Sequence, residues 1–576
     1  MHVGDWWFYV ADDAFISLRY ADRLLSGDGL TWTDGPPVEG YSNLLYVVLT
    51  AIVGLFGLDL LWAARLVGLV GAVGATAAVA WPVARHHWAG GWVAGLGVAA
   101  STSVALWVPG GLEQPLVALW LALALAGLGR ALAHDGLKAG LMVWPGIALA
   151  LMCWTRPDSP LLVAALTLGW FLAAGQDRKA LTTSAVLAGI PALATLAQVA
   201  VRLAYYGDWV PNTAHVKLRP SEAHTDMGAL WTAQALDNHL PLVLLAALAI
   251  VGTLPGEAAR ARVRIALPVL FAWLSYTVWI GGDIFPAFRH FVPMVVMLAW
   301  LAGGGVAGMA LRWRWAGPTL AVLATAGLGW MTLDQRTHPV VARAHNEQWV
   351  LLAADVGQVL GENFSHQQPL VAVSPAGAIP YASRLPALDM IGLNDPHIGR
   401  TETVGSGWLG HETGDGDYVF EQQPDIIFFT GPKGGARPTF ASEKQLAARS
   451  DFAQDYALVR WQTAPRRVQE PTEFAPWVRR SGVLGPTVSS ESARVPVWLL
   501  TEHAGVLDCS DDGRFRLVLG AGDAVGGSIA LPHGRWVPTE PTGVDVDLQP
   551  DGDLWRVTVT ATQPVTFRQL ILRPAP

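Results

Sequence analysis

Charged residues are scarce in this sequence. Only 15% of its 576 residues are Asp, Glu, Lys or Arg, whereas 52% are hydrophobic, and the mean hydropathy is +0.35. Because soluble domains carry about 25% charged residues, this composition excludes an ordinary soluble protein and predicts a polytopic membrane protein. The net charge is −8 and no Lys/Arg-rich tract with interleaved aromatics occurs, so nucleic acid is not an expected partner.

Cysteine is also scarce. There are two, Cys153 in an apolar run and Cys509 in the polar tail, so we expect neither a disulfide nor a cysteine metal cluster. The segment Met1 to Val10 lacks the basic start and apolar core of a signal peptide. No internal repeat is evident in the sequence.

Long apolar runs dominate the first part of the chain. A helix needs ~17–25 apolar residues to cross a bilayer. The run 44–57 has 14 residues and is predicted to be an interfacial or re-entrant helix instead. The runs predicted to span are 61–84, 92–108, 115–132, 138–155, 159–175, 180–203, 237–255, 264–281, 290–311 and 315–333.

The positive charges between these runs predict the topology. If 44–57 does not cross, one side receives ten Lys/Arg and the short loops of the other side receive five. The richer side is expected to be cytoplasmic. The outer face then receives the opening loop, the 204–236 loop and the polar tail. The ten are Arg85, Arg130, Lys138, Arg178, Lys179, Arg260, Arg262, Arg264, Arg312 and Arg314; the five are Arg156, Arg202, Lys217, Arg219 and Arg289.

Four regions follow from these patterns. Residues 1–58 are predicted to form a first external loop with interfacial helices, and residues 59–333 a transmembrane domain. Residues 334–464 alternate helix-like and strand-like segments, which indicates an α/β domain. In residues 484–576, apolar and polar residues alternate as in β-strands, which predicts a β-sandwich similar to carbohydrate-binding modules. Residues 465–486 are predicted to be the linker before it.

Two adjacent acids, Asp12 and Asp13, precede a short amphipathic stretch in the opening loop. Neighbouring carboxyls resist ionising together, so one can keep a raised pKa and act as a base. The alternative is that Asp12 only caps a helix starting near Ala14.

The polar motifs resemble those of the fold-C (GT-C) membrane glycosyltransferases, and most of all the group containing the mycobacterial terminal β-1,2-arabinofuranosyltransferase. In that superfamily an acid of the first external loop is catalytic and the donor is a polyprenyl-phosphate sugar. Only eleven residues precede Asp12, so the resemblance also leads us to expect that a first spanning helix is missing. The matching segments are Asp12-Asp13 with Arg19, Val38-Glu39-Gly40, Gly111-Leu112-Glu113, Thr155-Arg156-Pro157-Asp158, Tyr205-Tyr206-Gly207-Asp208, Pro211-Asn212-Thr213, Gly281-Gly282-Asp283 and Gly392-Leu393-Asn394-Asp395-Pro396.

Sugar transfer needs a base for the acceptor hydroxyl and cations for the departing phosphate. The resemblance implies Asp12 as base and Asp13 as its electrostatic or metal-binding partner. A divalent cation is left open, with Glu113 and Asp158 as further ligands beside Asp13. The phosphate-binding residues are expected to be Arg19, Arg65, Arg156, Lys217 and Arg289, and the substrate-binding residues Glu39, Glu113, Asp158, Tyr206, Asn212, Asp283, Asn394, Asp395 and His397.

Plainer interpretations remain for several of these residues. Arg156 and Asp158 flank Pro157 and could only pair with each other, and Tyr206 fits an interfacial aromatic belt equally well. Lys217 could be ordinary exposed loop, and Asn394, Asp395 and His397 could be ordinary turn residues.

The function expected from the sequence is transfer of a sugar from a polyprenyl phosphate to a cell-envelope glycan, a glycolipid or a surface protein. The reaction would take place at the outer face of the plasma membrane, and arabinofuranose is the sugar of the group most resembled. The alternatives are a transporter or flippase for a lipid-linked saccharide, and a polysaccharide polymerase. Transporters usually place charges near the midplane of repeated halves, a pattern not evident here.

Overall fold

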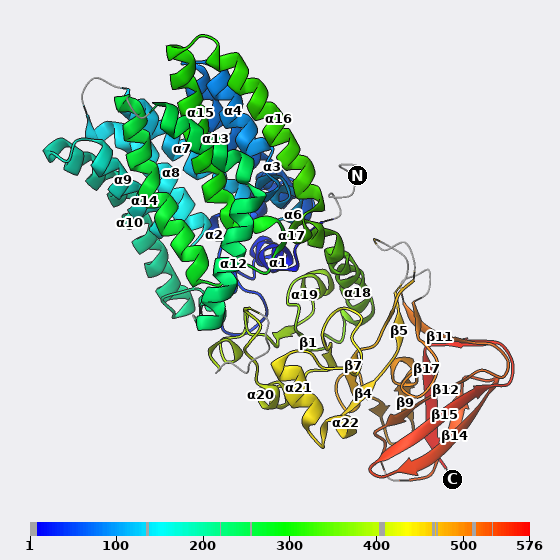
Figure 1. The fold of residues 1–576 in the computed structure, drawn as a ribbon. Coiled ribbons are helices and arrows are strands. Elements are labelled where there is room, and N and C mark those ends of the chain that lie inside the picture. Colours follow the sequence, from blue (N-terminus) through cyan, green and yellow to red (C-terminus); the bar gives the residue numbers. More distant parts are fainter. Residues whose placement is uncertain are drawn as a thin grey trace. The chain divides into compact units, whose positions relative to one another are not determined.

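The computed structural model describes residues 9–133, 137–218, 221–253, 256–401, 409–463, 467, 471–509, 514–532 and 534–575 (Figure 1). The chain divides into two compact units. The first comprises residues 1–30, 41–211 and 218–348, and the second comprises residues 31–40, 212–217 and 349–576. Arg219, which entered the charge count, lies outside the described residues.

The first unit is helical. Its centre is α15 (Val292–Arg312), a helix that is apolar and buried on nearly all sides, as expected for the middle of a bundle. Helix α3 packs against α7 and α4, α15 against α4 and α13, and α14 against α9 (Figure 1). The other long helices are α3 (Leu60–Ala84), α4 (Trp88–Ala99), α7 (Gln114–Leu132), α8 (Val143–Thr155), α9 (Ser159–Ala173), α10 (Arg178–Tyr206), α12 (Glu222–Asn238), α13 (Leu240–Thr253), α14 (Glu257–Trp279) and α16 (Ala316–Thr337).

The membrane class predicted from the sequence is confirmed. Among the described residues, six helices are long and apolar enough to cross a bilayer, or up to eight if each of two bent pairs is one span. All ten predicted runs contain helix, but α8 and α9 have only 13 and 15 residues. The predicted short helix is α2 (Leu44–Gly54), with 11 residues. The chain is therefore a multi-pass membrane protein.

Helix α1 (Asp12–Ser26) begins with the two acids. Its N-cap is Ala11, which makes no side-chain cap, and it ends at Gly27 with a left-handed φ of 88°. The alternative that Asp12 caps a helix starting near Ala14 does not hold, because Asp12 already belongs to the helix. Acids in a first helical turn are stabilised by the helix dipole.

The second unit contains a five-stranded sheet with strand order β2-β1-β3-β7-β4. The first three strands are parallel, with Val371 opposite both Ala387 and Ile426, and β7 is antiparallel to β3 and β4. Strand β7 falls within the segment predicted to be a linker. The strands are β1 (Val371–Val373), β2 (Ala387–Asp389), β3 (Ile426–Ile427), β4 (Tyr456–Leu458) and β7 (Trp477–Arg479), and the helices beside them are α18 (Trp349–Phe364), α19 (Ala378–Ser383), α20 (Gly416–Glu421), α21 (Ala441–Ala448) and α22 (Phe452–Asp455).

The end of the chain is rich in strands, as the sequence predicted. Its sheets have the orders β13-β17-β9-β8, β12-β15-β14 and β10-β11-β16, and a further pair is β5-β6. The strands are β5 (Trp461–Gln462), β6 (Glu473–Phe474), β8 (Thr487–Val488), β9 (Ala493–Pro496), β10 (Asp508–Cys509), β11 (Phe515–Leu519), β12 (Ala524–Ile529), β13 (Trp536–Glu540), β14 (Val544–Asp551), β15 (Leu554–Ala561), β16 (Val565–Phe567) and β17 (Gln569–Pro574).

Two short segments that are distant in sequence belong to the second unit. Trp32 Nε1 donates to the carbonyl of Ala376 at 3.2 Å, and Thr33 Oγ1 accepts from the amide of Ala387 at 3.1 Å. The other segment is carried by α11 (Asn212–Lys217), whose first amide donates to the carbonyl of Glu39 at 2.9 Å. Part of the opening loop is therefore built into the α/β unit.

Candidate active site

The acid pair lies against the turn that carries Glu113. The amide of Ala11 donates to the carbonyl of Gly110 at 3.1 Å. Gly111 has φ of 76°, and a Cβ there would come within 3.0 Å of the Ala14 methyl. Only glycine suits such a left-handed, closely packed position. This contact places the first turn of α1 beside the Glu113 turn, with Asp12 buried and Asp13 half-buried.

A hydrogen-bonded chain links α1 to Glu113. Ser17 Oγ donates to Asn43 Oδ1 at 3.1 Å, and Asn43 Nδ2 donates to Glu113 Oε2 at 2.9 Å. Asp13 and Ser17 lie one turn apart on α1 and thus share a face of the helix. Asn43 was not among the predicted residues; its position directly before the apolar α2 was the available signal.

Arg156 joins two carboxylates. Its Nη1 donates to Glu113 Oε1 at 2.6 Å, and its Nε and Nη2 donate to Asp158 at 2.7–3.2 Å. Burial alone would lower the pKa of Arg156, but Asp158 and Glu113 outweigh it and hold that pKa above its ordinary value. Tyr276 adds a donor to Asp158 Oδ2 at 3.3 Å. The plainer interpretation of Arg156 and Asp158 is thus correct as far as their pairing goes.

A second buried pair is formed by Asp283 and Arg289. Arg289 Nε and Nη2 donate to the Asp283 carboxylate at 2.5 and 3.2 Å. The guanidinium lies 4.2 Å from the ring centroid of Phe285 and 5.7 Å from that of Trp107. Because this cation lies close to two aromatic rings as well as to the Asp283 carboxylate, its charge is held in a fixed position.

Tyr9 and Trp107 belong to the same region and were not predicted. Their rings meet edge to face with centroids 5.6 Å apart. Within the described part of the chain, neither the Tyr9 hydroxyl nor the Trp107 Nε1 has a hydrogen-bond partner, although both are buried. Burial raises the pKa of Tyr9; Glu347, Asp283 and Asp13 raise it further, and Arg289 opposes them. Tyr9 is therefore within electrostatic reach of both the acid pair and the Asp283–Arg289 pair.

Arg65 and Arg19 are buried in the first unit as well. Arg65 Nε donates to the carbonyl of Pro109 at 3.2 Å, and its Nη2 donates to the carbonyl of Tyr9 at 3.4 Å. These bonds tie α3 to the segment just ahead of the acid pair. Tyr206, also in this unit, donates to the carbonyl of Leu30 at 2.9 Å and lies 3.2 Å from the Tyr41 hydroxyl.

The predicted residues of the second unit gather after β2. Asn212 Nδ2 donates to the carbonyls of Gly392, Leu393 and Asp395 at 2.7–3.1 Å, so it ties α11 to this turn. Asn394 donates to the buried carboxylate of Asp389 through its amide and side chain, at 2.8 and 3.0 Å. Burial raises the pKa of Asp389 to about 6, although the Asn394, Gly392 and Ile391 hydrogen bonds oppose the rise.

Asp395 and His397 form a smaller cluster with two residues that were not predicted. The ring of His397 stacks on Tyr418 at 4.0 Å, and its Nε2 lies 2.8 Å from Asp415 Oδ2. The Tyr418 hydroxyl donates to Asp395 Oδ2 at 3.1 Å. The side chain of His397 is 49% exposed, so this cluster is open to solvent.

Glu39 and Lys217 complete the predicted set in the second unit. Glu39 is buried, and Lys217 is the half-buried last residue of α11. Among the described residues, no group of three or more His, Cys, Asp or Glu is arranged to hold a metal ion. The predicted residues thus fall into one set in each unit, with the acid pair and both buried Arg–carboxylate pairs in the helical unit.

Comparison with known proteins agrees with this architecture. A family model described as a domain of unknown function (DUF8728) matches residues 340–481, and no curated protein matches. The crystal structure of apo ArnT from Cupriavidus metallidurans is 15% identical, with a TM-score of 0.53 over 82% of this chain and 95% of that one. ArnT bound to undecaprenyl phosphate is 13% identical, with a TM-score of 0.55 over 84% and 98%.

A third similar structure is the mycobacterial arabinofuranosyltransferase AftD. It is 13% identical, and its TM-score of 0.46, over 98% of this chain and 59% of that one, is too low to support an argument. At such identities the likeness to ArnT shows the fold alone. The chain has the fold of the fold-C membrane glycosyltransferases, with helical spans followed by a β-rich C-terminal region.

Proposed function

We propose that this protein is a membrane glycosyltransferase that moves a sugar from a polyprenyl-phosphate donor to a hydroxyl of an acceptor. The observation that carries the proposal is the acid pair at the start of α1, packed against the Glu113 turn and within electrostatic reach of Tyr9. ArnT, which shares the fold, has been solved with undecaprenyl phosphate bound, and this supports a carrier-lipid donor.

In the proposed reaction Asp12 accepts the proton of the acceptor hydroxyl, assisted by the negative charge of Asp13. The acceptor oxygen forms a bond to the anomeric carbon as the bond from that carbon to the phosphate oxygen breaks. The polyprenyl phosphate leaves with the electron pair. Cations of the same unit, above all Arg289 and Arg65, stabilise that phosphate.

Arg156 has a different role in this proposal from the one expected at first. Three of its five N–H groups already face the carboxylates of Glu113 and Asp158. We infer that Arg156 holds Glu113 in place rather than binding the donor phosphate. Glu113 in turn orients Asn43, which holds the face of α1 that bears Ser17 and Asp13.

The finer parts of the proposal follow from the resemblance in sequence. They are arabinofuranose as the sugar, a cell-envelope glycan, glycolipid or surface protein as the acceptor, and the outer face of the plasma membrane as the place of reaction. The polar tail is proposed to lie on that face because of the ten-to-five distribution of Lys and Arg. A reporter fused at Gly485 tests this, and a cytoplasmic readout would overturn the topology.

Transfer of labelled sugar from polyprenyl-phosphoryl sugars in membranes tests the function. Wild type is compared with Asp12→Asn and Asp13→Asn, and Asp28→Asn is the control because Asp28 follows the same helix and its side chain is 50% exposed. Transfer by wild type and by the control, together with loss in both acid-pair variants, supports the proposal. Full transfer in both acid-pair variants would contradict the mechanism.

A transporter for a lipid-linked saccharide is the second candidate, and one observation favours it. Two helix pairs are broken, with bends of 57° after Ala99 and 74° after Asn238. The residues at the two breaks are within hydrogen-bond distance of each other: His239 Nε2 lies 3.0 Å from Ser101 Oγ and 3.2 Å from Ser103 Oγ. Broken helices are typical of transporter binding sites. Movement of labelled lipid-linked sugar across vesicles without covalent transfer would favour this candidate.

A further inference from the structure

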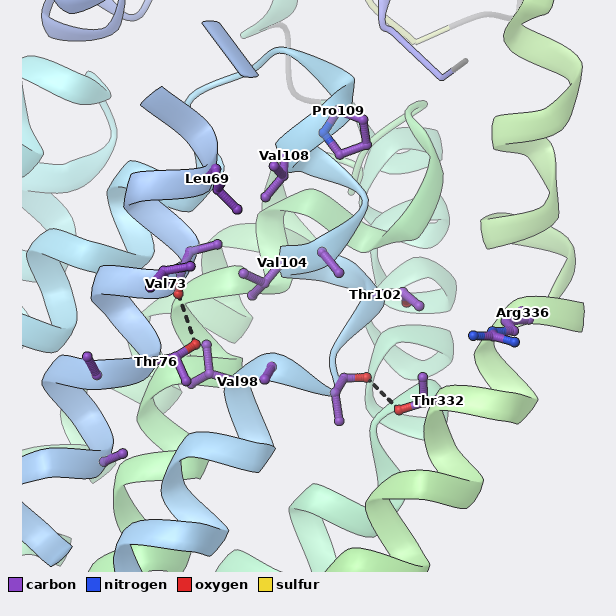
Figure 2. Close-up of a pocket in the computed structure, with 16 residues that line it drawn as sticks. Leu69, Val73, Thr76, Val98, Thr102, Val104, Val108, Pro109, Thr332 and Arg336 are labelled. Atoms are coloured by element: carbon purple, nitrogen blue, oxygen red, sulfur yellow. Dashed lines mark hydrogen bonds between the residues drawn. The ribbon is translucent and has the colours of Figure 1, made fainter. Parts of the chain in front are cut away.

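A cavity of about 680 Å³ lies in the first unit (Figure 2). Its walls are α3, α16 and the segment from the end of α4 through α5 (Thr102–Ala105) to α6 (Trp107–Gly110). Pockets of ~300–1,000 Å³ hold ligands of drug size, so this one has room for about one lipid chain.

The cavity is bordered by side chains that face the surroundings of the bundle. Leu69 and Val73 of α3 are 47% and 60% exposed, although both are apolar. Helix α3 is among those long and apolar enough to span. In a bilayer the opening beside these two residues therefore faces lipid, and a lipid chain can enter from the side.

The walls present almost no polar group to the cavity. The hydroxyl of each of its three threonines is engaged in a hydrogen bond within the protein at 2.9 Å: Thr76 donates to the carbonyl of Ala72, Thr332 to the carbonyl of Ala100, and Thr102 to Gln335 Oε1. Figure 2 shows the first two of these bonds. The threonines therefore contribute methyl groups, and an apolar chain loses no hydrogen bond by entering.

Among the described residues that line this cavity, one is charged: Arg336, the penultimate residue of α16. Within the described part of the chain, its guanidinium has no carboxylate or hydrogen-bond partner. Figure 2 shows the side chain at the edge of the cavity, near Thr102. An arginine near the end of a spanning helix extends its charge toward the headgroups, and its planar fork suits a phosphate.

We propose that this cavity binds one anionic phospholipid of the membrane, with an acyl chain between α3 and α5 and the phosphodiester on Arg336. A phosphodiester carries a single negative charge, which one guanidinium neutralises. A polyprenyl carrier has a much longer chain than the single lipid chain for which the cavity has room, so a membrane phospholipid matches the cavity better. The Pro109 end of this cavity adjoins the Gly110 carbonyl that accepts from Ala11, but the proposal concerns lipid binding and does not rest on the proposed reaction.

Native mass spectrometry of the full chain in detergent tests this, with phosphatidylglycerol, phosphatidylcholine or a polyprenyl phosphate added. We expect one phosphatidylglycerol per chain, bound about tenfold more tightly than phosphatidylcholine. Arg336→Gln should bind phosphatidylglycerol and phosphatidylcholine about equally. Arg314→Gln, which removes a charge just before α16, should leave it unchanged. Ala105→Leu, which fills the cavity, should weaken retention of both phospholipids.

Three results would overturn the proposal. Equal retention of phosphatidylglycerol and phosphatidylcholine by wild type would remove the role of the charge. An unchanged preference in Arg336→Gln would place the lipid elsewhere. Displacement of phosphatidylglycerol by an equimolar polyprenyl phosphate would assign the cavity to the carrier lipid. Because binding is measured without sugar transfer, the outcome does not depend on the proposed enzyme activity.

Discussion

Arg156 Nη1 donates to Glu113 Oε1 across 2.6 Å and joins the end of α8 to the turn before α7. The two residues are 43 positions apart, and each has a second partner, Asp158 for Arg156 and Asn43 for Glu113. This one bond therefore connects four segments of the helical unit to the helix that carries the acid pair.

The acid pair is expected to be essential for turnover. Asp12→Asn or Asp13→Asn should lower the transfer rate by ~10²-fold or more while the protein still inserts, because general-base catalysis contributes about 10²–10⁴-fold. Initial rates of labelled sugar transfer in membranes give the measurement, normalised to the amount of inserted protein. Asp28→Asn should retain the wild-type rate.

Removal of one member of the Arg156–Glu113 pair should destabilise the helical unit. Breaking a buried ion pair costs about 3–5 kcal/mol, because the remaining charge is left uncompensated. We expect Arg156→Met and Glu113→Met each to lower the midpoint of thermal unfolding in detergent. The double variant should recover part of the loss. Additive losses would show that the two side chains do not depend on each other.

Arg289 is expected to act on the donor. Arg289→Ala should raise the apparent KM for the polyprenyl-phosphate sugar by about tenfold, because it removes the proposed charge-assisted phosphate contact. The KM for the acceptor should change little. The control for Arg289 is Arg289→Lys, which keeps the charge but loses the bidentate fork. Equal changes in both KM values would indicate a structural role.

Asp389 should make the stability of the α/β unit depend on pH. Its pKa is raised by burial to about 6, against about 3.9 in an unfolded chain. The folded state therefore binds its proton more tightly, and the resulting stability is fully present below pH ~4 and lost as pH rises through about 6. The upper limit of this loss is about 3 kcal/mol.

The measurement for Asp389 is the unfolding midpoint between pH 4 and 7, for wild type and Asp389→Asn. The variant keeps the shape of the side chain but cannot titrate, so its midpoint should vary less across this interval. A pH profile parallel to that of wild type would show that Asp389 does not titrate here.

Several features of this protein were readable from the sequence because they depend on local pattern. The scarcity of charge and the length of the apolar runs determined the membrane class, and the shortness of 44–57 determined α2. Alternating apolar and polar residues at 514–519 and 554–559 predicted strands where the structure has β11 and β15. The acid pair was also found from local pattern, because two adjacent acids near long apolar runs can be identified without knowing which residues they contact.

Tertiary structure alone decided which partner each polar group has. Asn43 and its hydrogen-bond partner Glu113 are 70 positions apart in the sequence, and Asn212 and Gly392 are 180 apart. Contacts between such distant positions produce no periodic pattern in the sequence. Packing likewise placed residues 31–40 in the α/β unit, gave Arg156 its carboxylates and left Arg336 on an apolar cavity. Hydrophobic periodicity specifies which face of a helix is buried, whereas the pairing of polar groups depends on which faces meet.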